Sequence, residues 1–224
     1  MIFKIASVDS LIIYFGDEIN QEISSKVKNA YKCLKNLNDK GLIEIIPSYT
    51  SIFINFDIFK YDFSSLKQKI ISSIDLSIKN EINEEIITID VYYGIEVAFD
   101  LENISKQTKL SINEIITLHS NKLYDVYAIG FLPGFAYLGN VDKQIAIPRR
   151  SSPRKIIPKG SLAIANTQTA IYPQDSPGGW NIIGKTAMQL FDKNLSTLSP
   201  LHVGNKIKFN SITKEKFLAQ GGVL

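Results

Sequence analysis

The sequence predicts two domains: an α+β domain over residues 1–90, followed by a mainly β domain over residues 91–224. Turn-forming residues divide the chain at this point, because the first part holds two of the 13 glycines and one of the eight prolines. Charge divides it in the same way, with −3 over residues 1–90 and +6 over residues 91–224. Few turns indicate long regular elements, and frequent Gly and Pro indicate short strands joined by tight turns.

The first part alternates strands and helices. Apolar side chains spaced four and three residues apart predict an amphipathic helix over 21–38. A second such face, from Phe63 to Ile78, predicts a helix over 63–79. Apolar and β-branched runs predict strands at 3–8, 11–16, 42–47, 51–56 and 85–92. If the first two runs form one doubled strand region, the order β-α-β-β-α-β indicates a ferredoxin-like sandwich.

The second part begins with two short helices within residues 98–122. Ser111 and Glu114 have the spacing of a capping box at the start of the second helix. Short apolar runs broken by Gly and Pro then follow, at 124–131, 145–148, 161–173, 181–191 and 205–210. This pattern predicts a small barrel or sandwich.

Composition disfavours several classes of protein. Cys33 is the only cysteine and there are two histidines, so neither a disulfide nor a metal site is expected. A net charge of +3 is too mild for a dedicated nucleic-acid binder. No apolar stretch approaches the roughly 18 residues of a membrane span, and the apolar N-terminus lacks a signal-peptide cleavage site. We therefore expect a soluble, cytoplasmic protein that binds neither nucleic acid nor membranes.

The only three arginines of the chain, Arg149, Arg150 and Arg154, lie within six residues, whereas the other 22 basic residues are lysines. Arg presents a planar fork that binds a carboxylate or phosphate through two donors at once, whereas Lys is a compact point charge. The segment 148–160 is therefore a candidate anion site or a surface for an acidic partner, and a solvated basic loop is the plain alternative. If the segment is extended, Arg149 and Arg150 face opposite sides and serve different roles.

Two further segments, 130–139 and 168–180, combine aromatic side chains with turn residues. Aromatic walls near a turn can form a small-molecule pocket, and loops dense in polar and aromatic groups often bind ligands. Ordinary hairpins with packed aromatic rings are the alternative in both places. The candidate substrate-binding residues are Phe131, Pro133, Gly134, Phe135, Gln168, Tyr172, Ser176, Pro177, Gly178, Gly179 and Trp180.

Two other features have competing interpretations. His119 ends an apolar helical face, so it is either a satisfied core histidine or the best candidate for proton transfer. The run from Gly179 to Thr186 fits the P-loop string GxxxxGK[ST]. However, this run follows a turn instead of a buried strand and contains Trp180 and two isoleucines, so a turn followed by a strand is the preferred interpretation.

Several phrases of the second part, in order, resemble one family. YYGIEVAFDL, LHSNKLYDVYAIGFLPGFAYLG and PRRSSPRKIIPKGSLAIANTQTAIYPQDSPGGWNIIGKT are similar to the family of 5-oxoprolinase B subunits, also described as allophanate hydrolase subunit 1 or KipI-like. The motifs cover about 92–209. The resemblance implies a ferredoxin-like N-terminal domain and a cyclophilin-like β-barrel. Lys185 stands where an Arg is usual in the family.

The resemblance also implies an activity and partners. Members work with the C and A subunits in an ATP-dependent 5-oxoprolinase that opens 5-oxo-L-proline to L-glutamate, so this chain is expected to be inactive alone. Arg149, Arg150 and Arg154 would bind carboxylate or phosphate and stabilise negative charge, and His119 would transfer a proton. The aromatic residues would wall the small-molecule substrate. A KipI-like inhibitor of a sporulation histidine kinase, or a subunit of an allophanate or urea-degrading hydrolase, remains the alternative.

Overall fold

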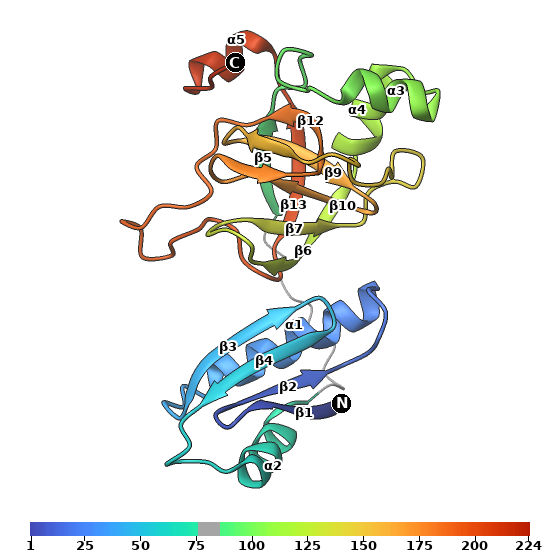
Figure 1. The fold of residues 1–224 in the computed structure, drawn as a ribbon. Helices are drawn as coiled ribbons and strands as arrows, with labels where there is room; N and C mark the ends of the chain where they lie inside the picture. Colours follow the sequence, from blue (N-terminus) through green and yellow to red (C-terminus); the bar gives the residue numbers. More distant parts are fainter. Residues whose placement is uncertain (76–85) are drawn as a thin grey trace. The chain divides into compact units, whose positions relative to one another are not determined.

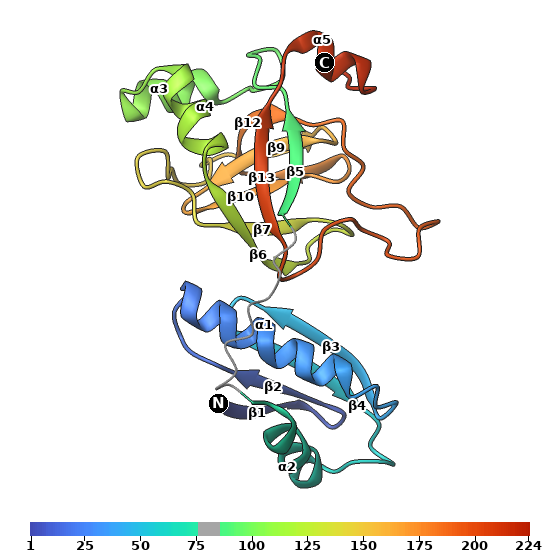
Figure 2. The same ribbon diagram turned by 180° about the vertical axis from the view of Figure 1, so that it is seen from behind.

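The computed structural model describes residues 1–75 and 86–224, which belong to two compact units, Met1–Asn83 and Glu84–Leu224. Figure 1 shows the elements of both units in sequence colours, and Figure 2 shows them from behind. Among the described residues, no helix is long and apolar enough to cross a membrane.

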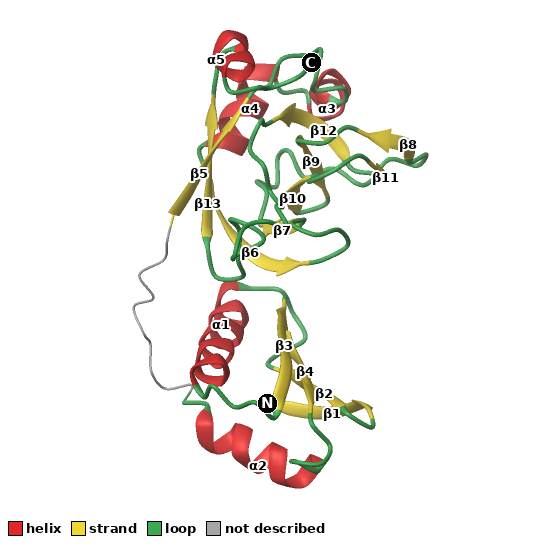
Figure 3. Ribbon diagram, turned by 90° about the vertical axis from the view of Figure 1, so that its left-hand side faces the viewer, coloured by secondary structure: helices red, strands yellow, loops and turns green. Residues whose placement is uncertain are grey.

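The first unit is a four-stranded antiparallel sheet with two helices on one face (Figure 3). The strand order is β1-β2-β4-β3, and the strands are β1 (Ile2–Ser7), β2 (Ser10–Tyr14), β3 (Leu42–Ser48) and β4 (Ser51–Phe56). The helices are α1 (Gln21–Asn36) and α2 (Phe63–Ser73). Alternate strand residues such as Ile13 and Ile54 form one buried cluster with Val27, Leu34 and Leu66 of the helices. Burying this face of the strands and the apolar stripes of the helices holds the unit together.

The predicted ferredoxin-like order of the first unit is not confirmed. The first two apolar runs form two strands that pair antiparallel, so the initial strand region is doubled as the sequence suggested. The strand expected to complete the order, β5 (Ile86–Val91), pairs parallel with β13 (Lys206–Ser211) in the second unit. An alternating apolar run specifies a strand but not its partner, because the pairing surface is common to all strands. The second predicted helix ends earlier than expected, at Ser73, where Ile74 has an extended backbone; the rest of its predicted range, including Ile78, lies outside the described residues.

The second unit is built on a seven-stranded mixed sheet that curves into a barrel-like form (Figure 1), which agrees with the predicted mainly β barrel. The strand order is β12-β9-β10-β7-β6-β13-β5. Just beyond β5, Tyr92 and Lys185 exchange two backbone hydrogen bonds of 2.8 Å, which bring the two edges of the sheet together. The remaining strands of this sheet are β6 (Leu123–Ile129), β7 (Ala136–Gly139), β9 (Ser161–Ala165), β10 (Gln168–Ile171) and β12 (Asn181–Lys185).

Smaller elements surround this sheet. Strands β8 (Arg154–Ile157) and β11 (Ser176–Gly178) form a two-stranded ribbon. The helices are α3 (Leu101–Thr108), α4 (Ile112–Ser120) and α5 (Lys214–Ala219). As predicted, α3 and α4 are short and fall within 98–122.

Strand alternation gives the curved sheet two different apolar faces. Leu162 and Ile164 of β9 belong to the large cluster inside the barrel, whereas their neighbours Ala163 and Ala165 belong to a second cluster on the outer face. Successive side chains of a strand point to opposite faces, so a single strand can contribute to both. The outer cluster also holds Phe135, Tyr172 and Trp180, which are candidate substrate-binding residues.

The predicted capping box begins α4. Ser111 Oγ accepts a hydrogen bond from the Glu114 backbone N–H at 3.3 Å, and Glu114 Oε2 accepts one from the Ser111 backbone N–H at 2.8 Å. We expect Ser111→Ala to lower the free energy of unfolding by about 1 kcal/mol, because one helix donor loses its acceptor. The exposed mid-helix change Thr117→Ala is the control and should be neutral or slightly stabilising. Denaturant titration, followed by fluorescence of the only tryptophan, measures both, and equal stabilities would contradict the prediction.

Candidate functional site

A cavity of about 270 Å³ opens at the outer cluster of the second unit. Its lining residues are Phe131, Phe135, Tyr137, Arg149, Pro153, Tyr172, Pro177, Gly178, Gly179 and Trp180. The two aromatic segments singled out in the sequence therefore meet at one place, together with the first of the three arginines. A larger hollow of about 570 Å³ lies in the first unit, but none of the predicted site residues lines it.

The walls of the cavity are aromatic rings packed edge to face. Phe135 lies at the centre, with ring centroids 5.3 Å from Tyr172 and 5.9 Å from Trp180, at interplanar angles of 81° and 85°. Edge-to-face pairs at these distances stabilise one another beyond their burial. Phe131 is 60% exposed and packs edge to face on Phe135. The cavity thus has a firm aromatic floor and one exposed aromatic side chain beside it.

Two glycines have no room for a side chain. A Cβ on Gly178 would lie 2.4 Å from the Tyr172 hydroxyl oxygen. Gly134 has φ +81°, and a Cβ there would lie 2.3 Å from the Leu190 carbonyl oxygen. Gly134 therefore supplies the backbone conformation of the turn before Phe135, and Gly178 lets the backbone approach the tyrosine hydroxyl.

Arg149 is the one charged side chain among the described residues that line the cavity. Its guanidinium carbon lies 5.7 Å from the centroid of the Trp180 ring, a cation–π distance. Burial raises the pKa of the Tyr172 phenol to about 12, against smaller opposing effects of the Trp180 backbone and Arg149. Burial likewise raises the pKa of Tyr137. At neutral pH the cavity therefore carries a single positive charge within aromatic walls.

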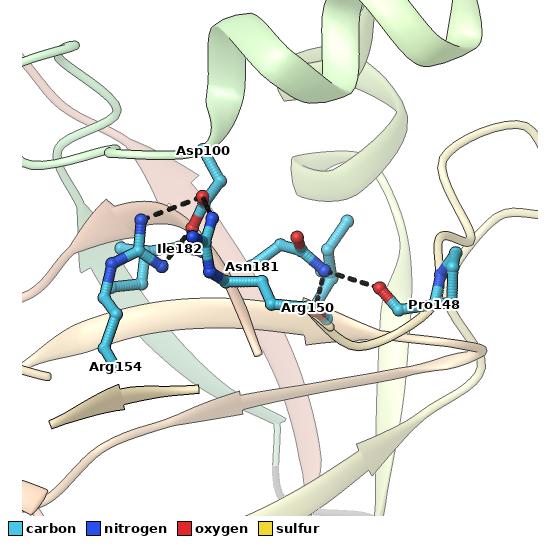
Figure 4. A network of polar contacts seen from close by, with 7 residues as sticks. Asp100, Pro148, Arg150, Arg154, Asn181 and Ile182 are labelled. Carbon is cyan, nitrogen blue, oxygen red and sulfur yellow. Dashed lines mark hydrogen bonds and ion pairs between the residues drawn. The ribbon is translucent and has the colours of Figure 1, made fainter. Parts of the chain in front are cut away.

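The other two arginines point to a buried carboxylate, Asp100, and not to the cavity lining (Figure 4). Arg150 Nη1 donates to Asp100 Oδ1 at 2.5 Å. Arg154 donates from Nη1 at 2.7 Å and from Nη2 at 2.9 Å, so it grips the same carboxylate with both ends of its fork. The prediction that Arg149 and Arg150 face different sides agrees with this arrangement, whereas a single anion site shared by all three arginines does not.

Asp100 is a residue that sequence reasoning missed as part of the site. An Asp directly before a predicted helix is ordinarily interpreted as an N-cap. Asp100 does occupy the N-cap position of α3, but its side chain makes no capping hydrogen bond. Its acceptor oxygens bind the arginines and the Ile182 backbone N–H instead, the latter at 2.7 Å. One sequence signal could have pointed to Asp100: three clustered arginines need an acidic partner to balance their charge.

His119 lies inside the barrel, fully buried, and is not among the residues that line the cavity. Its Nδ1 is 3.0 Å from the Tyr93 hydroxyl, and its Nε2 is 3.0 Å from the Thr169 hydroxyl. Since Thr169 donates to the Ala163 carbonyl, it accepts from Nε2–H, and Tyr93 donates to Nδ1. Burial lowers the pKa of His119 to about 3. The geometry is that of a satisfied core histidine and gives no support to the predicted proton transfer.

Thr169 and its neighbours on β10 show why His119 and the cavity are separated. The Thr169 side chain points into the barrel toward His119, whereas Ala170 belongs to the outer cluster. Adjacent residues of a strand face opposite sides of the sheet. The sheet itself therefore stands between His119 and the aromatic cavity.

Four predicted residues are close in sequence to the cavity but are not in its lining, namely Pro133, Gly134, Gln168 and Ser176. Gln168 begins β10 and pairs with Ala165 and Gly139. Ser176 is buried in β11, and its Oγ has no hydrogen-bond partner within the described part of the chain. These residues support the segments that form the cavity.

The run that resembles a P-loop forms a strand, in agreement with the interpretation preferred from the sequence. Residues Asn181–Lys185 form β12 and pair antiparallel with β9. Lys185 Nζ donates to the Val223 carbonyl at 2.7 Å. A paired strand cannot offer the ring of free backbone N–H groups that cradles phosphates in a P-loop.

Comparison with known proteins agrees with the expected family. The family model "Carboxyltransferase domain, subdomain C and D" matches residues 1–201. The chain is 37% identical over 221 residues to the 5-oxoprolinase B subunit of Bacillus subtilis, covering 94% of this chain and 92% of that protein.

Two solved structures share the fold. TTHA0988 superposes with a TM-score of 0.82 at 27% identity, covering 91% of this chain, and this chain spans 40% of that longer one. The Kluyveromyces lactis urea amidolyase superposes with a TM-score of 0.73 at 16% identity over 97% of this chain, or 15% of its own length, and shows the fold alone. From the matched family model and the curated relative together, this chain belongs to the family of 5-oxoprolinase B subunits, within the carboxyltransferase subdomain C and D group.

Proposed function

We propose that the chain is the B subunit of a cytoplasmic, ATP-dependent 5-oxoprolinase, which opens 5-oxo-L-proline to L-glutamate together with the A and C subunits and is inactive alone. The name of the Bacillus subtilis relative supports the activity. The observation that carries the proposal for this chain is the cavity, where the single charge of Arg149 lies among aromatic walls. 5-Oxoproline is a small ring with one carboxylate and therefore matches both properties.

The residues divide into two groups in this proposal. The Arg149 guanidinium binds the substrate carboxylate through two parallel N–H donors, and Trp180 and Phe135 hold the ring. Arg150 and Arg154 hold the segment through Asp100. In the overall reaction the amide C–N bond breaks, water supplies the new C–O bond, and ATP hydrolysis drives the opening of the lactam. ATP is assigned to the complex as a whole, and β12 of this chain, a paired strand, offers no P-loop for it.

Reconstitution tests the proposal. The chain is co-expressed with the A and C subunits of the same source, and glutamate formed from 5-oxoproline is measured with and without ATP. We expect ATP-dependent turnover from the complete complex and none from this chain alone. An assembled complex without turnover would count against the enzyme and favour a regulatory role such as kinase inhibition.

The same assay tests the role of Arg149. Arg149→Lys keeps the charge but loses the bidentate fork, so we expect the KM for 5-oxoproline to rise by up to about tenfold, the equivalent of one hydrogen bond. Lys155→Ala is the matched control, because Lys155 belongs to the same basic segment but is exposed and outside the lining. An unchanged KM for Arg149→Lys would show that Arg149 does not bind the substrate carboxylate in this cavity.

A further inference from the structure

We propose that Asp100 is a positioning residue for the cavity: it holds the segment 148–154 so that Arg149 alone presents its charge to the ligand. The inference rests on the proposed role of the cavity as a carboxylate site. Asp100 itself is not among the residues that line the cavity, so it acts through the groups that it binds.

The Asp100 carboxylate is almost completely enclosed, with 2% of its side chain exposed, and it accepts four hydrogen bonds. Three come from Arg150 and Arg154, and the fourth comes from the backbone of Ile182. A buried carboxylate is stable only when its oxygens are paired in this way. The two guanidinium groups are in turn neutralised in part by it, and this keeps them from competing for an anion in the cavity.

Hydrogen bonds fix both partners of the Arg149–Trp180 contact, and Asp100 joins them through the Arg150 side chain and the Ile182 backbone. On the Arg149 side, the Arg150 backbone N–H donates to the Gly179 carbonyl at 2.8 Å. Asn181 Nδ2 donates to the Pro148 carbonyl at 2.8 Å (Figure 4). The residues before and after Arg149 are thus both tied down.

On the Trp180 side, the backbone of Ile182 both donates to the Asp100 side chain and accepts from the Asp100 N–H at 2.9 Å. Asp100 therefore anchors the start of β12, two residues from Trp180. With the segment held at both ends, the Arg150 side chain reaches Asp100 and the Arg149 side chain lies over the indole ring.

Removing the charge of Asp100 releases this arrangement. Asn in its place has nearly the same shape but keeps one acceptor oxygen and adds a donor that faces the guanidinium groups. Arg150 and Arg154 would then repel each other without a counter-charge. We expect the segment to loosen and Arg149 to leave the face of Trp180.

The test uses Trp180 as the probe, because it is the only tryptophan of the chain. The full chain is titrated with 5-oxoproline while tryptophan emission is recorded. For Asp100→Asn we expect at least a tenfold weaker affinity. In the Arg149→Ala background, Asp100→Asn should not weaken the affinity further, because a residue that acts only through Arg149 has no effect once Arg149 is absent.

Asp39 provides a matched control in the other unit. Its carboxylate is also enclosed, 6% exposed, and it binds Lys60 and Lys69 together with the Tyr61 hydroxyl and the Gly41 N–H. Asp39→Asn removes an equally well-paired buried charge and should leave the emission of Trp180 and the binding unchanged. Wild-type affinity in Asp100→Asn, or equal effects with and without Arg149, would overturn the positioning role.

A ligand-free measurement separates this inference from the proposed function. If the wild-type chain does not bind 5-oxoproline, the substrate assignment fails, but the emission maximum and acrylamide quenching of Trp180 still test the positioning. Asp100→Asn should then reproduce the change seen in Arg149→Ala, and the double variant should add nothing. If Asp100→Asn does not fold, Arg150→Gln and Arg154→Gln each remove one of the two guanidinium groups that bind Asp100. Both variants should shift the Trp180 emission in the same direction as Arg149→Ala. No shift in either variant would refute the inference.

Discussion

Lowering the pH from 7 to 5 is expected to cost the second unit about 2 kcal/mol of folding free energy through His119 alone. Burial lowers the pKa of this histidine to about 3 in the folded state, whereas a histidine in an unfolded chain titrates near 6.5. The stability that the second unit gains from keeping His119 neutral is therefore fully present above pH 6.5. It is lost progressively as the pH falls toward 3, because only the unfolded chain takes up the proton over that range.

Denaturant titrations at pH 7 and pH 5, followed by Trp180 emission, measure this loss in the unit that contains both residues. His119→Gln is the matched variant, because its amide can replace one donor and one acceptor but does not titrate. The difference in unfolding free energy between the two pH values should be about 2 kcal/mol smaller in His119→Gln than in the wild type. Equal differences would mean that His119 is accessible and protonated in the folded chain, which would restore it as a candidate for proton transfer.

Gly178→Ala is expected to destabilise the second unit by about 1–3 kcal/mol and to weaken ligand binding in the cavity. Besides the Tyr172 hydroxyl at 2.4 Å, the new Cβ would meet Ile157 Cδ1 at 2.7 Å. Both side chains are buried, so neither can move away freely. Displacement of Tyr172 would also disturb Phe135, whose ring packs edge to face on it.

Gly179→Ala is the control for this change. Its Cβ would have no neighbour nearer than 3.7 Å, so it should be neutral or stabilising by up to about 1 kcal/mol, since alanine reduces the freedom of the unfolded chain. Combining Gly178→Ala with Tyr172→Phe removes the closest atom and should recover part of the loss. If the two alanine variants are equally stable, the backbone does not approach Tyr172 as closely as the structure shows.

Most of the regular elements and the location of the unusual residues could be predicted from the amino-acid sequence alone. The helices at 21–36 and 63–73 and the capping box at Ser111 follow from patterns only a few residues long. The segments 130–139 and 168–180 were also predicted from the sequence as possible walls of a pocket, and residues from both line the cavity. Such features are local, because side chains at fixed spacing share a face or a turn.

The roles of these residues, in contrast, depend on contacts between distant parts of the chain. The acceptor of Arg150 and Arg154 lies 50 and 54 positions away along the chain, and the backbone donor that completes Asp100 lies 82 positions away. The strand at 86–91 likewise took its partner from 206–211 instead of from the first unit. An arginine carries its charge and a strand its pattern wherever they lie, but burial and pairing with distant segments select the partner. For this reason the three arginines could be found in the sequence, whereas their division between a buried carboxylate and an open cavity could not.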